Sequence, residues 1–200
     1  MRHFFFCFFI LFVSTACTTT APLIDGRDVS WQTHQQEVAQ LQYWTIQGRL
    51  AVNNGSESWH MDMSWQQQGD TYVIKLVAPL GAGQIQLRGD KHGVVLDDGE
   101  TAPLYADDVD SLLYESTGLQ IPVSGLYYWV RGLPDPNMLN GEMNLSAGKL
   151  KRLQQGGWQL RFRRYQQVNN TSLPNKLFLR RDDVDVRLVI DQWHLGLVTS

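Results

Sequence analysis

The stretch from Ser58 to Gln68 limits the possible folds of this chain more than any other. Its sequence is SWHMDMSWQQQ, so large apolar residues alternate with polar ones. A period of two places the two sets on opposite faces of a β-strand. One face of this strand must therefore contact a dry interior while the other meets water. The apolar set is Trp59, Met61, Met63 and Trp65.

The following residues predict a hairpin partner for this strand. Residues 68–70 (QGD) favour a turn, because Gly and Asp tolerate left-handed backbone, and Ile74 and Leu76 then resume the alternation. Residues 79–83 (PLGAG) end the second strand. Leu80 is the one bulky side chain of this loop, at a position where a polar residue is usual.

Helices precede and interrupt the strands. Ser30 is a suitable cap, and apolar residues at spacings of three and four predict a helix over 31–41. The same change of period predicts a second helix that Asp107 caps and Gly118 ends. A third helix is expected over 121–130.

The last third of the chain returns to strands. Trp158, Leu160 and Phe162 alternate cleanly with Gln and Arg, which gives their strand one dry face. A polar loop is expected at 168–173. The strands outside 58–68 are expected at 44–52, 72–78, 85–87, 93–96, 101–105, 149–154, 158–164, 176–181 and 184–190.

This order predicts a mainly β (α+β) fold. An antiparallel sheet with one dry face must be covered or must curl around that face. We therefore expect a strongly curled antiparallel sheet with the helices as plug or lid. Its concave face should gather Trp59, Met61, Met63, Trp65, Ile74, Leu76, Trp158, Leu160 and Phe162. These side chains could form an ordinary core or line a cavity.

The N-terminus has the features of an export signal. Arg2 is positive, residues 4–13 are apolar, and small residues precede Cys17. A cysteine after Ala16 resembles a bacterial lipoprotein signal, in which the cysteine carries the lipid; the alternative is ordinary cleavage that leaves a free thiol. We expect a lipoprotein signal peptide at 1–16, a lipidated tether at 17–29 and a single domain at 30–200.

Charge is unevenly distributed along the chain, although the net charge is only −3. Residues 149–181 contain nine Lys and Arg and no acid, whereas residues 97–110 contain six acids and no base. A basic face suits an anionic surface or an acidic partner. The alternative is a solvated outer sheet face.

No arrangement of residues predicts catalysis. There is no G-x-S-x-G turn for a serine nucleophile, and the histidines lack metal-ligand spacing. We expect no enzyme activity and no metal site. Nucleic acid is not expected as a partner of an exported acidic chain. The scattered histidines are His34, His60, His92 and His194.

An ordered set of short motifs resembles the LolB family of outer-membrane lipoprotein receptors. No single motif is strong, but the set covers residues 17–195 and accompanies the lipoprotein-like cysteine. The matching residues are Ser30-Trp31, His34-Gln35-Gln36, Gly48, Trp65-Gln66-Gln67, Pro79-Leu80-Gly81, Gly118, Ile121-Pro122, Trp129-Val130, Gly132-Leu133-Pro134, Trp158, Tyr165, Leu173-Pro174 and Asp191-Gln192-Trp193.

The resemblance implies an unclosed β-barrel with a hydrophobic cavity, to which Trp129 would also contribute. It implies a monomer that accepts acylated lipoproteins from the periplasmic carrier LolA, without a cofactor, and inserts them into outer-membrane lipid. Cys17 would be the lipid-attachment site, and the absence of Asp at position 18 favours the outer membrane, facing the periplasm. Leu80 would protrude and serve membrane insertion.

Two other protein classes share parts of this pattern. A small outer-membrane β-barrel also has alternating strands, although it needs lipid-facing apolar bands of about 9–11 residues per strand. A periplasm-facing lipoprotein that binds another hydrophobic ligand would have the same fold.

Overall fold

A computed structural model describes residues 26–196 of the 200-residue chain. Cys17, the expected signal peptide and most of the expected tether lie outside the described residues. The described part contains one sheet, three α-helices and one short 3-10 helix.

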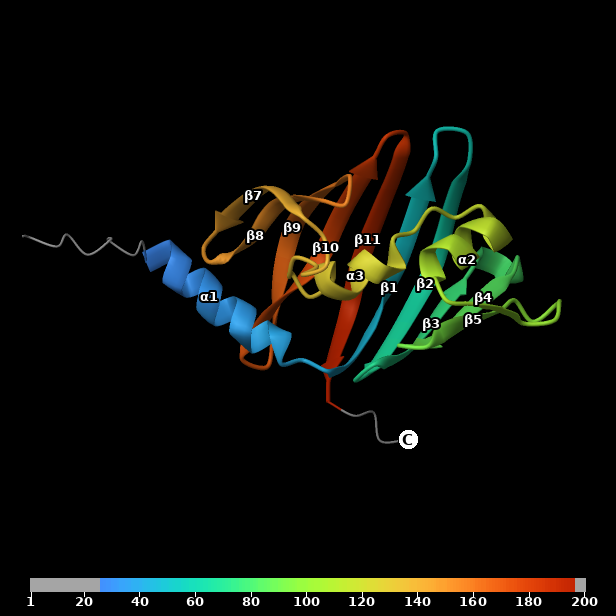
Figure 1. Ribbon diagram of the computed structural model, residues 1–200, viewed down its shortest axis with the longest axis horizontal. Coiled ribbons are helices and arrows are strands. Elements are labelled where there is room, and N and C mark those ends of the chain that lie inside the picture. The colour runs from blue at the N-terminus through green and yellow to red at the C-terminus, as the bar shows by residue number, and fades with distance from the viewer. Residues whose placement is uncertain (1–25, 197–200) are drawn as a thin grey trace, which may run out of the picture.

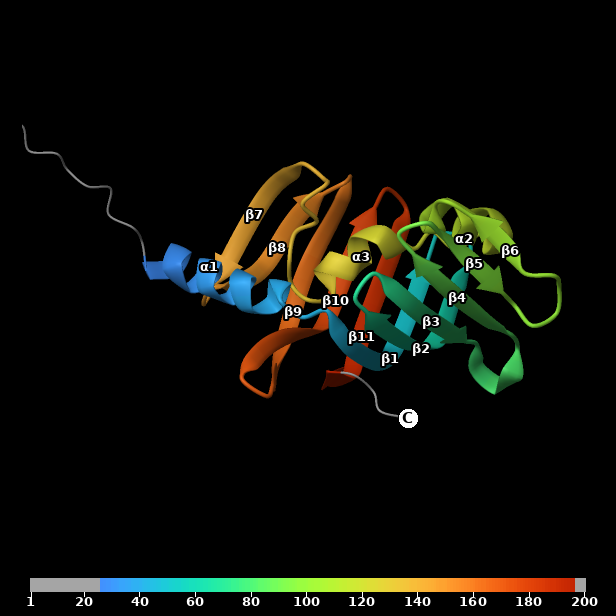
Figure 2. The same ribbon diagram turned by 60° about the horizontal axis from the view of Figure 1, so that its bottom comes forward.

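Eleven antiparallel strands form the sheet, in the order β6-β5-β4-β3-β2-β1-β11-β10-β9-β8-β7. Strands β6 and β7 are its two edges and do not pair with each other, so the sheet is curled but not closed (Figures 1 and 2). The central pair joins β1, near the start of the domain, to β11 at its end. The strands are β1 Tyr43–Asn53, β2 Ser58–Gln68, β3 Thr71–Val77, β4 Gln84–Asp90, β5 Gly93–Asp97, β6 Leu104–Ala106, β7 Asn140–Ser146, β8 Lys149–Gln155, β9 Trp158–Val168, β10 Thr171–Arg181 and β11 Val184–Leu195.

The predicted period of two is confirmed in the strands that carry it. In β2 the buried residues are Met61, Met63, Trp65 and Gln67, and in β9 they are Trp158, Leu160 and Phe162. Intervening side chains of both strands face water or are half-buried. The alternation therefore assigns the two faces of the sheet correctly.

Two expectations about the strands are wrong. The polar loop expected at 168–173 does not exist, because β9 continues to Val168 and β10 begins at Thr171. Asn169 makes the tight turn between them with a φ of 52°, which Asn tolerates better than most residues. Strand β7, which lacks clean alternation, was not predicted.

The helices also begin at other residues than expected. Helix α1 covers Gly26–Ala39, so Ser30 lies inside it and is not its cap. Helix α2 covers Val109–Thr117, and its cap is Asp108, not Asp107: the Ser111 N–H donates to Asp108 Oδ1 at 2.7 Å. Gly118 ends α2 in the left-handed conformation, as predicted.

Helix α3 covers Val123–Trp129, and it lies with α2 across one face of the sheet (Figures 1 and 2). Leu112 and Leu113 of α2 and Leu126 of α3 are buried in the same core as the inner residues of the strands. The helices thus cover the dry face, as the sequence requires.

Candidate functional site

The inner face of the sheet collects the apolar residues that alternation singled out. Register places Met63 opposite Leu76 and Trp65 opposite Ile74 on the same face of β2 and β3. Nine of the ten candidate residues are buried, and Trp59 is half-buried against them. The nine are Met61, Met63, Trp65, Ile74, Leu76, Trp129, Trp158, Leu160 and Phe162.

In this arrangement the ten residues are packed core. Leu113 and Leu126 from the two helices belong to the same hydrophobic cluster, and Trp129 has no exposed surface. Helices α2 and α3 therefore cover the inner face in this structure.

A cleft of about 440 Å³ opens where the inner face meets the two helices. Carboxylates, including Asp70 and Asp108, line the cleft together with aromatic side chains. The apolar lining consists of Trp65, Tyr72, Val94, Val109, Val123, Tyr127 and Tyr128.

Aromatic rings connect this cleft to the centre of the sheet. Trp44 lies 5.3 Å from Trp65 and 5.5 Å from Trp193, and it stacks on Tyr127 at 6.5 Å, measured between ring centroids. Tyr127 belongs to α3, so the helix and the sheet meet through large, flat apolar surfaces. Such surfaces contribute much apolar contact area.

Hydrogen bonds fix the C-terminal end of α3 to the sheet through Gln155 of β8. The Trp129 Nε1–H donates to Gln155 Oε1 at 2.7 Å, and the Asp135 N–H donates to the same oxygen at 2.8 Å. Gln155 Nε2 donates to Asp135 O at 2.8 Å and to Asn140 Oδ1 at 2.6 Å. Because Gln155 is only 2% exposed, each of these bonds is shielded from water.

Arg131 strengthens the same end. Its guanidinium is buried, donates to the carbonyls of Tyr127 and Leu41 at 3.1 Å each, and lies 4.2 Å from the centre of the Tyr127 ring. Burial lowers the pKa of Arg131 from its ordinary value. Neither Arg131 nor Gln155 could be predicted from the sequence, because no local pattern distinguishes them from other polar residues.

The N-terminal end of α3 is held differently. Its Ser124 hydroxyl donates to Asp110 Oδ2 of α2 at 2.5 Å, and the Ser124 N–H donates to Asp110 Oδ1 at 3.1 Å. Burial raises the pKa of Asp110. Among the described residues, no hydrogen bond joins α2 to the sheet. Helix α2 therefore meets the sheet through apolar packing of Leu112 and Leu113, and it meets α3 through Asp110 and Ser124.

The loop after β3 presents Leu80 to solvent. Leu80 is fully exposed and lies in the 3-10 helix η1, Pro79–Gly81. The Ala78 N–H donates to Gly83 O at 2.9 Å and closes the loop. Leu80 has a φ of 57°, which costs an L-residue about 1–2 kcal/mol. Because its side chain is fully exposed, Leu80 is not folded back into the core.

Solved structures with the same fold define the class of this protein. A DUF1329 family protein from Desulfovibrio piger matches with a TM-score of 0.58 and 8% identity, covering 88% of this chain and 93% of that one. The LolA superfamily protein NE2245 from Nitrosomonas europaea matches with a TM-score of 0.55 and 5% identity, covering 84% and 94%. This chain therefore shares its fold with a protein of the LolA superfamily.

Sequence comparison then identifies the family. The protein-family model of the Outer membrane lipoprotein LolB family matches residues 42–193 of this chain. The Outer-membrane lipoprotein LolB of Nitrosococcus oceani is 40% identical over 168 residues, which are 84% of each chain. That of Alkalilimnicola ehrlichii is 35% identical over 185 residues, 92% of each chain. The chain belongs to the LolB family of outer-membrane lipoproteins. No helix of residues 26–196 combines the length and apolar character needed to cross a membrane.

Proposed function

We propose that this protein is a lipid-anchored receptor, attached through Cys17 to the outer membrane and facing the periplasm. It accepts acylated lipoproteins from the carrier LolA and inserts them into outer-membrane lipid. The observation that carries this proposal is the inner face: large apolar side chains lie beneath two helices that are firmly attached at one end only.

Replacing α2 by an acyl chain costs little free energy, because the inner face exchanges apolar contacts with the helix for apolar contacts with the chain. Lifting α2 would uncover Leu112 and Leu113 and the inner face beneath them. An entering acyl chain would rebury that face, at about 0.8 kcal/mol for each buried methylene group. Met61 and Met63 suit this role, since the Met side chain adapts its shape to irregular partners.

Direction requires no cofactor. A lipoprotein moves from carrier to receptor when the receptor binds acyl chains more tightly than the carrier does. Binding, rather than catalysis, is then the whole activity of the protein.

Leu80 serves the second step, the contact with the bilayer. One leucine gains about 1.5–3 kcal/mol on leaving water, which is enough to bias a transient contact and too little to anchor a protein. Its full exposure in a closed, short loop supports this role.

The test is capture of a lipoprotein from loaded carrier by Met63→Glu and by its neighbour control Ser64→Glu. A charge at Met63 faces the inner side, where burial costs several kcal/mol, whereas Ser64 lies on the other face. We expect capture to fall at least tenfold for Met63→Glu and to persist for Ser64→Glu.

Urea unfolding of both variants separates lost binding from lost folding. Equal capture by both folded variants would contradict the proposal. If the unaltered protein captured no lipoprotein but bound other apolar ligands, it would instead be a periplasm-facing lipoprotein for another hydrophobic ligand.

A further inference from the structure

The outer face of the sheet carries a row of cations around one aromatic residue. Register places Arg152 of β8 opposite Arg161 of β9, Arg161 opposite Phe178 of β10, and Phe178 opposite Arg187 of β11. Lys176 lies two residues before Phe178 on the same strand. We call these five residues the outer cationic face.

Like charges lie directly opposite one another in this region. Arg152 pairs with Arg161, and Arg164 pairs with Lys176. Such cross-strand pairs are destabilising. Ion pairs do not relieve them, because the two that the described residues form are Arg49–Asp191 and Arg180–Asp185. The outer cationic face therefore has an unbalanced positive charge, although the whole chain has a net charge of −3.

Phe178 is half-buried at the centre of these charges. The guanidinium carbons of Arg161 and Arg187 lie 6.0 Å and 5.9 Å from its ring centre, and Lys176 Nζ lies 5.5 Å away. An aromatic ring on the wet face of a sheet, ringed by cations, has the chemistry of a membrane–water interface, where aromatic and basic side chains meet headgroups.

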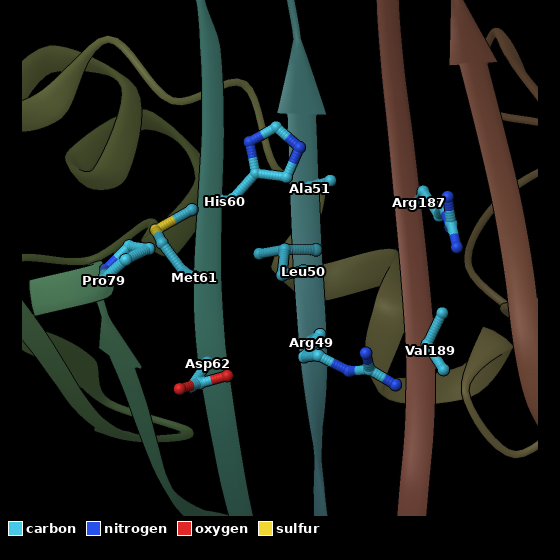
Figure 3. Close-up of a pocket in the computed structure, with 9 residues that line it drawn as sticks. All are labelled: Arg49, Leu50, Ala51, His60, Met61, Asp62, Pro79, Arg187 and Val189. Carbon is cyan, nitrogen blue, oxygen red and sulfur yellow. The ribbon is translucent and has the colours of Figure 1, made fainter.

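Two shallow hollows flank this ring and offer space for headgroups. One, of about 330 Å³, is lined by Arg152, Arg161, Arg180 and Phe178, with Glu142 as its carboxylate. The other, of about 290 Å³, lies on the far side of Arg187 (Figure 3). It is lined by Arg49, Leu50, Ala51, His60, Met61, Asp62, Pro79, Arg187 and Val189.

The second hollow links the outer cationic face to the loop that carries Leu80. Pro79, the residue before Leu80, lies at one side of this hollow and Arg187 at the other (Figure 3). The hollow thus joins cations of β1 and β11 to the loop residue next to the exposed Leu80. Helices α2 and α3 cover the opposite face of the sheet (Figure 1).

We propose that the outer cationic face binds the phosphate headgroups of anionic phospholipids and lays the convex side of the sheet on the membrane. Arg pairs with phosphate through two parallel hydrogen bonds, and clustered cations are attracted to an anionic membrane surface. The inner face and its two helices then point away from the bilayer. This inference goes beyond lipoprotein transfer and does not require it.

The experiment measures sedimentation of the mature chain (residues 17–200, with Cys17→Ala) with lipid vesicles. Vesicles of phosphatidylethanolamine with phosphatidylglycerol are compared with vesicles of phosphatidylcholine alone, over a range of salt concentrations. We expect binding to the anionic vesicles only, and we expect it to weaken as salt rises, since exposed charges are screened over about 10 Å at 0.1 M.

The variant that tests the site combines Arg152→Gln, Arg161→Gln and Arg187→Gln. Each cation near an anionic surface contributes about fivefold in affinity, so the three together should lower it roughly a hundredfold. The matched control removes three exposed cations of the β3–β5 region: Lys75→Gln, Arg88→Gln and Lys91→Gln. It should bind anionic vesicles nearly as well as the unaltered chain.

Thermal unfolding of the triple variant guards against a folding artefact. Relief of the Arg152–Arg161 repulsion should leave its melting temperature unchanged or higher. Equal loss of binding in the two triple variants would reduce the effect to net charge and overturn the proposal. So would normal vesicle binding by the Arg variant combined with slower capture of lipoprotein from the carrier, which would make this face a protein-docking surface.

Discussion

The two ends of helix α3 meet the rest of the molecule in opposite ways. At the C-terminal end, Trp129 and Arg131 are buried and bonded to β8 and to the segment before β1. At the N-terminal end, Ser124 is bonded only to Asp110 of another helix. The polar contacts that join α3 to the sheet are therefore confined to its C-terminal end, and at its N-terminal end the two helices are bonded to each other.

The largest effect is expected from breaking the anchored end at Trp129. Trp129→Ala removes a fully buried aromatic side chain, which costs about 3–5 kcal/mol of unfolding free energy. Urea unfolding measures it. Trp59→Ala is the control, since Trp59 is only half-buried; an equal loss in the two variants would show that α3 is not specially anchored.

A loss of similar size is expected for Gln155→Leu. The change leaves the Trp129 Nε1–H, the Asp135 N–H and the Asp135 carbonyl without their partners. Each buried, unpaired polar group costs about 1–3 kcal/mol. The neighbour control Gln154→Leu, on the exposed face, should change unfolding free energy by less than about 0.5 kcal/mol. Similar values for both would contradict the assignment of Gln155 as the anchor.

The stability contributed by Asp110, at the N-terminal end of α3, should depend on pH. Burial raises the pKa of Asp110, so the folded protein holds this proton more tightly than the unfolded chain does. Stability from Asp110 is therefore fully present below its unfolded pKa of about 3.9 and is lost as pH rises through the higher folded value.

Asp110→Asn should remove this slope, because the amide does not titrate and can still accept from Ser124. Chemical unfolding across the acid range, compared with Asp108→Asn, measures the difference between the slopes. If unfolding free energy changed with pH in Asp110→Asn as it does in the unaltered protein, Asp110 would not be the group that titrates.

The smallest effect on folding, and a large one on function, is expected at Leu80. Leu80→Glu changes a fully exposed residue, so unfolding free energy should change by less than about 0.5 kcal/mol. Capture from the carrier should persist while release into liposomes falls, so that lipoprotein accumulates on the receptor. Fractionation after a two-step assay measures both. Joint loss of capture and release would make Leu80 a docking residue.

The inner strand residues and Leu80 could be predicted from the sequence, whereas Gln155 could not. Alternation in β2 and β9 identified the inner residues, because the side-chain period of a strand is a local property. The resemblance to the LolB family predicted that Leu80 protrudes from its loop, and the small neighbours of Leu80 agreed with that prediction; the structure shows it fully exposed. Gln155 was not predicted as a buried residue, because a glutamine on a strand predicts a wet face. Its burial is favourable only because Trp129 and Asp135, from another part of the chain, form hydrogen bonds with it.

Local sequence patterns were enough to predict which faces of the strands are dry, where Gly118 ends a helix, and that Leu80 lies in a short loop. These follow from backbone geometry over a few residues. The pairing of β1 with β11, the bond between Asp110 and Ser124, and the hollow shared by Arg187 and Pro79 could be known only from the folded chain. Such pairings join distant parts of the chain, and they depend on strand order and on which buried polar groups find partners, neither of which is encoded in a local period.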